Sequence, residues 1–120
     1  MKMTAQILTG ALVFFGFFLG VPSVINGLPA DAPTMLDNHF RFFAGIWIGV
    51  GLGLAYCIKN LEHATVLFRG LLLTIFIGGV ARIIGFTAYD PEARMLVATA
   101  IELIFPPALV WMQSRISHET

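Results

Sequence analysis

The sequence predicts an all-α protein: an integral membrane four-helix bundle with up-down topology and both termini in the cytoplasm. Of its 120 residues, 58% are hydrophobic and only 12% are charged, a composition far from that of soluble domains. Four apolar stretches are each long enough to cross a bilayer, and short polar connections separate them. We therefore expect a single transmembrane domain, residues 1–120, with membrane lipids as its immediate partners.

The four spans are expected at about residues 5–24, 39–58, 64–86 and 91–112. The first contains an uncharged run, residues 7–24, that resembles the core of a signal peptide. That run is long, however, and Pro33 directly follows the small residues that would mark a cleavage site. A membrane span is the favoured interpretation.

The distribution of Lys and Arg predicts the orientation of the spans. The connection at residues 26–38 has two aspartates and no Lys or Arg, and Asp37 or Asn38 can cap the second helix. Four cations lie at the opposite side of the predicted membrane: Lys2, Lys59, Arg69 and Arg115. Because cytoplasmic segments carry an excess of Lys and Arg, we expect both termini inside.

Glycines at helical spacing predict close helix packing. Gly45, Gly49 and Gly53 recur every four residues in the second span, so they share one side of that helix. We expect this side to face another helix of the same chain or of a second copy.

Two shorter glycine pairs have the same interpretation. Gly16 and Gly20 form a small-residue step in the first span, and Gly78 and Gly79 thin the third span. These faces favour another helix, a homodimer or a different membrane protein as the packing partner.

Three charged residues fall in the outer half of the predicted membrane, on three different helices: Arg41, Arg82 and Glu102. A charge in hydrocarbon costs at least ~2.5 kcal/mol, so these side chains are expected to pair. His39 and Tyr89 lie near the same rim. Together the five residues predict a polar pocket with a positive surplus, which suits a carboxylate, a phosphate or an anionic lipid headgroup. The alternative is structural: Glu102 pairs with Arg82 only to fix helix register, while Arg41 reaches the headgroups.

Several classes of function are disfavoured by the sequence. The net charge is zero and no basic stripe is present, which argues against nucleic acid as a partner. His39 is predicted outside, whereas His63 and His118 are predicted inside, so no metal site is expected. No nucleophile motif, phosphate loop or dinucleotide fingerprint is present, and no cofactor is expected.

Three short motifs carry a family resemblance: His39-x-Arg41 before a glycine-rich second span, Gly78-Gly79-x-x-Arg82 in the third, and Glu102-Leu103 in the fourth. With these the chain resembles a bacterial domain-of-unknown-function family of small four-helix membrane proteins. The resemblance implies an inner-membrane location and marks Arg41, Arg82 and Glu102 as pattern residues. In size and helix count the chain also looks like the small multidrug-resistance transporters, but the carboxylate typical of their first span is missing from residues 7–24.

Three functions are compatible with these residues. The first is a non-enzymatic inner-membrane protein that binds an anionic or amphipathic ligand, or supports an envelope complex, through the outer pocket. The second is a dimeric, proton-coupled transporter that uses Glu102. The third is a membrane enzyme with Glu102 as acid or base, which we favour least because no catalytic constellation accompanies it.

Overall fold

A computed structural model describes residues 1–88 and 90–119, and for residues 117–119 it describes the backbone alone. The helices are α1 (Lys2–Asn26), α2 (Thr34–Cys57), the short 3-10 helix η1 (Ile58–Asn60), α3 (Thr65–Gly85) and α4 (Ala93–Glu119). The described ranges contain no strand. Since α1 to α4 are all long and apolar enough to cross a membrane, the predicted all-α fold with four spans is confirmed.

Two helix starts differ from those expected. α2 begins at Thr34 directly after Pro33, five residues earlier than predicted, so Asp37 and Asn38 lie inside the helix and do not cap it. Pro33 favours this start because its fixed φ is compatible with the entry to a helix. α4 begins at Ala93, slightly later than predicted, and continues well beyond residue 112.

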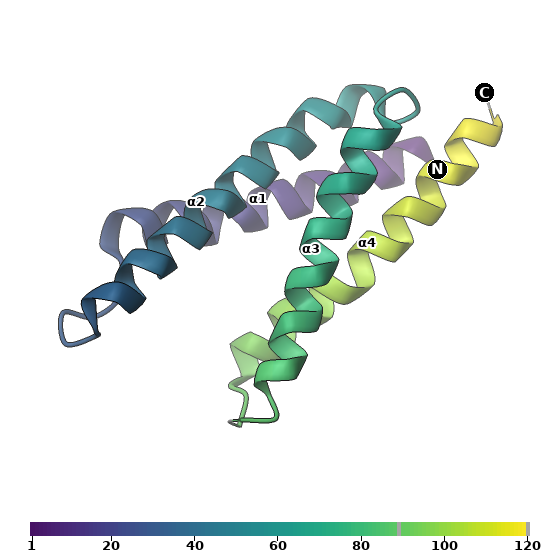
Figure 1. Ribbon diagram of the computed structural model, residues 1–120. Helices are drawn as coiled ribbons and strands as arrows, with labels where there is room; N and C mark the ends of the chain where they lie inside the picture. The colour runs from purple at the N-terminus through teal and green to yellow at the C-terminus, as the bar shows by residue number, and fades with distance from the viewer. Residues whose placement is uncertain (89, 120) are drawn as a thin grey trace.

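The helices form two antiparallel hairpins arranged as a V (Figure 1). α1 and α2 make one hairpin, and α3 and α4 make the other. The hairpins meet where both ends of the chain lie beside the α2–α3 connection, which we call the closed end (Figure 1). They diverge toward the α1–α2 and α3–α4 connections, which we call the open end.

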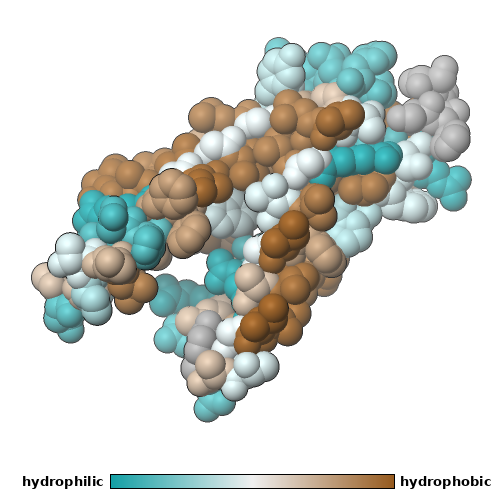
Figure 2. Space-filling model, viewed as in Figure 1, coloured by the Kyte–Doolittle hydropathy of each residue, from teal (hydrophilic) through white to brown (hydrophobic). Residues whose placement is uncertain are grey.

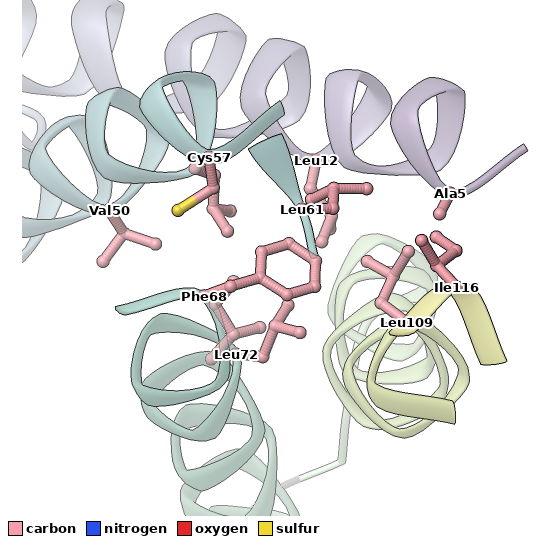
Figure 3. Close-up of a cluster of buried hydrophobic side chains, with 11 residues drawn as sticks. Ala5, Leu12, Val50, Cys57, Leu61, Phe68, Leu72, Leu109 and Ile116 are labelled. Carbon is pink, nitrogen blue, oxygen red and sulfur yellow. The ribbon is translucent and has the colours of Figure 1, made fainter. Parts of the chain in front are cut away.

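The hydrophobic core holds the two hairpins together at the closed end. Phe68 of α3 lies among buried side chains from α1, α2, α3 and α4, between Leu72 and Leu61 in Figure 3. The cluster consists of Ala5, Leu12, Val50, Leu54, Cys57, Leu61, Phe68, Leu72, Ile75, Leu109 and Ile116. It contains no residue between Leu12 and Val50 or between Ile75 and Leu109, so packing between the hairpins is concentrated at the closed end.

The outer surface suits a lipid environment. Hydrophobic residues cover the helices, whereas hydrophilic residues gather at the closed end and at the two tips of the V (Figure 2). Large apolar side chains such as Phe14, Phe18, Leu52 and Ile84 are more than half exposed. In water such a surface would associate, but in a bilayer it meets acyl chains.

Glycine contacts show which helix faces approach closely. A methyl group at Gly16 would lie 3.3 Å from the Trp47 ring, and one at Gly20 would lie 2.9 Å from Ile48 Cγ1, so these glycines let α1 pack on α2. At Gly53 it would lie 2.7 Å from Leu71 of α3.

Three of the glycines expected at helix interfaces have open space around them instead. A methyl group added at Gly45, Gly49 or Gly78 would have no atom of another helix within 4 Å. Their expected role therefore does not apply inside one chain, and packing against a second copy stays a prediction.

Candidate functional site

A cleft with two lobes separates the hairpins in the open half of the molecule (Figure 2). The outer lobe, about 480 Å³, is lined by Phe15, Leu19, Gly20, Ser23, Phe40, Phe43, Ala44, Trp47, Arg82, Glu92, Arg94, Met95 and Ala98. The inner lobe, about 660 Å³, is lined by Phe43, Ile46, Trp47, Val50, Thr74, Ile75, Gly78, Ala81, Arg82 and Glu102. Because the lobes share Phe43, Trp47 and Arg82, we treat them as one cleft.

The two walls of the cleft differ in chemistry. The α1–α2 wall is mainly apolar and includes four aromatic side chains, of which the Phe15 and Trp47 rings meet edge to face with centroids 5.9 Å apart. The α3–α4 wall carries the charges, Arg82, Arg94, Glu92 and Glu102. A molecule in the cleft therefore meets apolar rings on one side and ionic groups on the other.

Arg82 and Glu102 form an ion pair across α3 and α4. Arg82 Nε donates to Glu102 Oε1 over 2.7 Å, as expected from two intramembrane charges at similar depth on adjacent helices. Gly79 allows this contact, because its missing side chain leaves room for Glu102 Cβ, which would lie 3.0 Å from a methyl group there. The pairing holds α4 against α3.

The two partners differ sharply in exposure. The Glu102 side chain is 2% exposed, whereas that of Arg82 is 40% exposed and lines both lobes. Glu102 accepts only from Nε, and within residues 1–88 and 90–116 neither η nitrogen of Arg82 has a hydrogen-bond acceptor. The guanidinium group thus retains an unused fork of N–H donors beside the cleft.

Arg41 does not join this pair, which corrects the expected three-residue pocket. Its Nε donates to Asp37 Oδ2 over 2.9 Å, and its Nη1 donates to the Val24 carbonyl over 2.9 Å at the end of α1. Asp37 also accepts from the Leu28 N–H over 2.7 Å. Arg41 therefore closes the tip of the α1–α2 hairpin by binding carbonyls at the negative end of the α1 dipole.

Gly27 makes that arrangement possible. It ends α1 with φ of 66°, a left-handed conformation that favours glycine. A side chain at this position would overlap both the Arg41 guanidinium group and the Asp37 carboxylate.

The predicted positive surplus is also wrong. Arg41 is neutralised by Asp37 outside the cleft, and Arg82 by Glu102 inside it. Arg94 Nη2 lies 3.6 Å from Glu92 Oε2 at the mouth. The charges that line the cleft therefore sum to zero.

The two rim residues do not reach the pair either. His39 is exposed on α2, where its ring lies 6.4 Å from that of Phe43, and it does not line the cleft. Tyr89 lies outside the described residues. Of the five expected pocket residues, the structure thus brings together Arg82 and Glu102.

A second polar cluster lies at the closed end. Gln113 of α4 is fully buried; its Nε2 donates to the Leu61 carbonyl over 2.6 Å, and its Oε1 accepts from Arg69 Nε over 2.8 Å. Gln6 Nε2 donates to the Ile58 carbonyl over 2.8 Å. These amides tie α1, α3 and α4 to the α2–α3 connection.

Lys2 and Glu62 add an ion pair to this closed-end cluster. Lys2 Nζ lies 3.0 Å from Glu62 Oε1. The pKa of the Glu62 carboxyl is held below its ordinary value, mainly by a hydrogen bond from the backbone N–H of Glu62 itself and next by the contact with Lys2. The Glu62 carboxyl therefore stays ionised at neutral pH, and its contact with Lys2 links the start of α1 to the α2–α3 connection.

The sequence-based prediction missed Gln113 and Gln6 as organising residues. A signal was present for Gln113, because it follows Leu109 by four residues and precedes Ile116 by three, so all three share a helix face. A polar side chain on an apolar, core-facing stripe indicates a buried hydrogen bond.

The described residues provide no metal centre: no group of three or more His, Cys, Asp or Glu side chains comes together among them. Cys57 is buried in the core at the closed end. Within the cleft, Arg82 and Glu102 can support ion pairing, hydrogen bonding and proton exchange.

Fold and surface together define a small multi-pass membrane protein. Residues 4–113 match the family described as Domain of unknown function (DUF4345), and the chain belongs to that family. No curated protein and no solved structure matched the chain.

Proposed function

We propose that this protein binds an amphipathic ligand in the cleft between its hairpins, with a carboxylate or phosphate headgroup at Arg82. The observation that carries the proposal is the unused donor fork of Arg82, which lines both lobes of the cleft while Glu102 occupies only Nε. Such a fork matches the paired oxygens of a carboxylate or phosphate.

The remainder of the cleft suits the apolar part of such a ligand. Phe43 and Trp47 border both lobes, and Phe15 and Phe40 extend the aromatic wall toward the open end. Lobes of about 480 and 660 Å³ fall in the range of small-molecule sites. Since the cleft lies between membrane-spanning helices, a lipid-like molecule can enter it from the bilayer.

We further propose a bacterial inner-membrane location with the open end outside. Lys2, Lys59 and Arg115 lie toward the closed end, where a cytoplasmic side would concentrate cations. Reporter fusions after Asp31 and after Asn60 should report outside and inside, respectively. An outside signal from the Asn60 fusion would reverse the orientation.

Native mass spectrometry of protein extracted in mild detergent tests ligand binding. We expect the wild type to retain an acidic amphiphile and Arg82→Lys to retain several-fold less, because lysine keeps the charge beside Glu102 but lacks the planar fork. Arg115→Lys at the closed end is the matched control and should retain the wild-type amount.

Two results would contradict the proposal. Equal retention by Arg82→Lys and wild type would remove Arg82 from the site. Preferential retention of cationic amphiphiles, abolished by Glu102→Gln, would instead favour the proton-coupled transporter.

A further inference from the structure

We propose that the anionic headgroup enters the cleft together with one proton, which Glu102 takes up. This inference rests on the proposed function and concerns the regulation of the same site. It is carried by the geometry of the ion pair: a buried carboxylate engages one guanidinium group through a single nitrogen, and no other charged side chain lines the inner lobe.

Glu102 faces one ionisable partner. The described parts of the four helices carry the following Asp, Glu, His, Lys and Arg residues: Lys2 on α1, Asp37, His39 and Arg41 on α2, Arg69 and Arg82 on α3, and Arg94, Glu102, Arg115, His118 and Glu119 on α4. Lys2, Arg69 and Arg115 lie toward the closed end, and Asp37, His39 and Arg41 toward the tip of the other hairpin. Arg94 is eight residues before Glu102, about 12 Å along α4. The side chains that α2 contributes around Glu102, Phe43, Ile46, Trp47 and Val50, are apolar.

A second anion at Arg82 changes the balance of this pair. With Glu102 ionised, the cleft is neutral, so an added carboxylate or phosphate monoanion would leave one uncompensated negative charge. A second negative charge in the same site raises the proton affinity of the Glu102 carboxylate. The effect is strengthened because the Glu102 side chain is only 2% exposed. Uptake of one proton from the aqueous phase at the open end restores neutrality.

The proton need not break the existing contact. A protonated Glu102 keeps one carbonyl-type oxygen that accepts from Arg82 Nε, while the headgroup takes the η nitrogens. One anion and one proton therefore enter, and the total charge of the cleft is unchanged. Binding tightens as the pH falls, because protons are more available to Glu102.

Trp47 provides a direct readout, because it borders both lobes. The other tryptophan, Trp111, is exposed and stacks with Arg115 at a distance of 5.3 Å from Arg115 Cζ to the ring centroid. In Trp111→Phe, quenching of Trp47 by a brominated alkyl sulfonate reports occupancy in phosphatidylcholine nanodiscs. A sulfonate keeps its charge across the pH range, so any pH dependence belongs to the protein.

We expect the affinity for the sulfonate to rise by up to about tenfold for each unit by which pH falls, the linkage of one proton to one ligand. Glu102→Gln, made in the same background, should bind with no such slope and as tightly as the wild type at low pH. Asp31→Asn removes an exposed carboxylate at the open end and should keep the wild-type slope.

Calorimetry on the Trp111→Phe protein in two buffers of different ionisation enthalpy provides an independent measurement. One proton taken up per sulfonate supports the proposal, and none overturns it even if Glu102→Gln does not fold. Sulfonate binding that is independent of pH, yet weakened by Arg82→Lys, overturns the proton coupling and leaves the proposed function standing. The absence of binding at every pH overturns both.

Discussion

The closed and open ends of this protein use similar polar side chains in different ways. At the closed end, the Gln113 amide is fully buried and is satisfied on both its oxygen and its nitrogen. At the open end, Arg82 offers a guanidinium group of which only Nε is engaged. A fully buried amide that is bonded through both its oxygen and its nitrogen fixes a structure, whereas a half-exposed guanidinium group beside a cleft leaves capacity for a ligand.

The largest expected effect tests the open end. Arg82→Gln leaves Glu102 buried without its cation, so the free energy of unfolding in detergent should fall by about 3–5 kcal/mol at neutral pH. The loss should shrink as pH falls, because protonated Glu102 no longer needs a counter-ion. Thermal unfolding monitored across pH measures both effects.

The double variant Arg82→Gln/Glu102→Gln is the matched control. It removes both charges and places two amides in contact range, so it should be clearly more stable than Arg82→Gln alone. A single variant as stable as the wild type at neutral pH would show that Glu102 does not depend on Arg82.

A smaller effect is expected at the closed end from Gln113→Leu. The substitution strands the Leu61 carbonyl and removes the acceptor of Arg69, so we expect a loss of about 2–3 kcal/mol. The angle between the hairpins should also become more variable. Spin labels at Asp31 and Asp90 would then give a broader distance distribution, whereas Lys59→Gln, on the surface of the same end, should leave it unchanged. An unchanged distribution in Gln113→Leu would show that the apolar core alone sets the angle.

The smallest expected loss of stability distinguishes Gly53 from Gly49 on α2. Gly53→Leu should cost about 1–2 kcal/mol, because its side chain would overlap Leu71 between the hairpins. In Gly49→Leu the new side chain would point into open space, so the free energy of unfolding should equal that of the wild type. If Gly49→Leu instead reduces the oligomer size in detergent, this face contacts a second copy.

The sequence predicted the four helices and the Arg82–Glu102 contact for the same reason. Hydrocarbon demands long apolar helices and forces buried charges to find partners, so length and charge position carry enough information. Arg41 was misplaced although Asp37 stands four residues before it, a spacing that brings side chains together on a helix. The prediction used Asp37 as a helix cap and so left Arg41 free for the pocket.

The glycine faces were harder to predict for a different reason. Spacing shows that Gly45, Gly49 and Gly53 share one side of α2, but not how α2 is rotated about its axis against its neighbours. That rotation is set by tertiary contacts such as Trp47 on Gly16 and Leu71 at Gly53. The cleft itself follows from the angle between the hairpins, which depends on the closed-end cluster and core.

The pairing of Arg41 with Asp37 has a consequence for biogenesis. Both residues belong to α2, and Arg41 binds carbonyls at the end of α1, so the first hairpin neutralises its own intramembrane charge. Arg82 and Glu102 do the same within the second hairpin. When each hairpin partitions from the translocation machinery into the bilayer, the charge of its Arg41 or Arg82 is therefore already paired, and this pairing does not require the other hairpin.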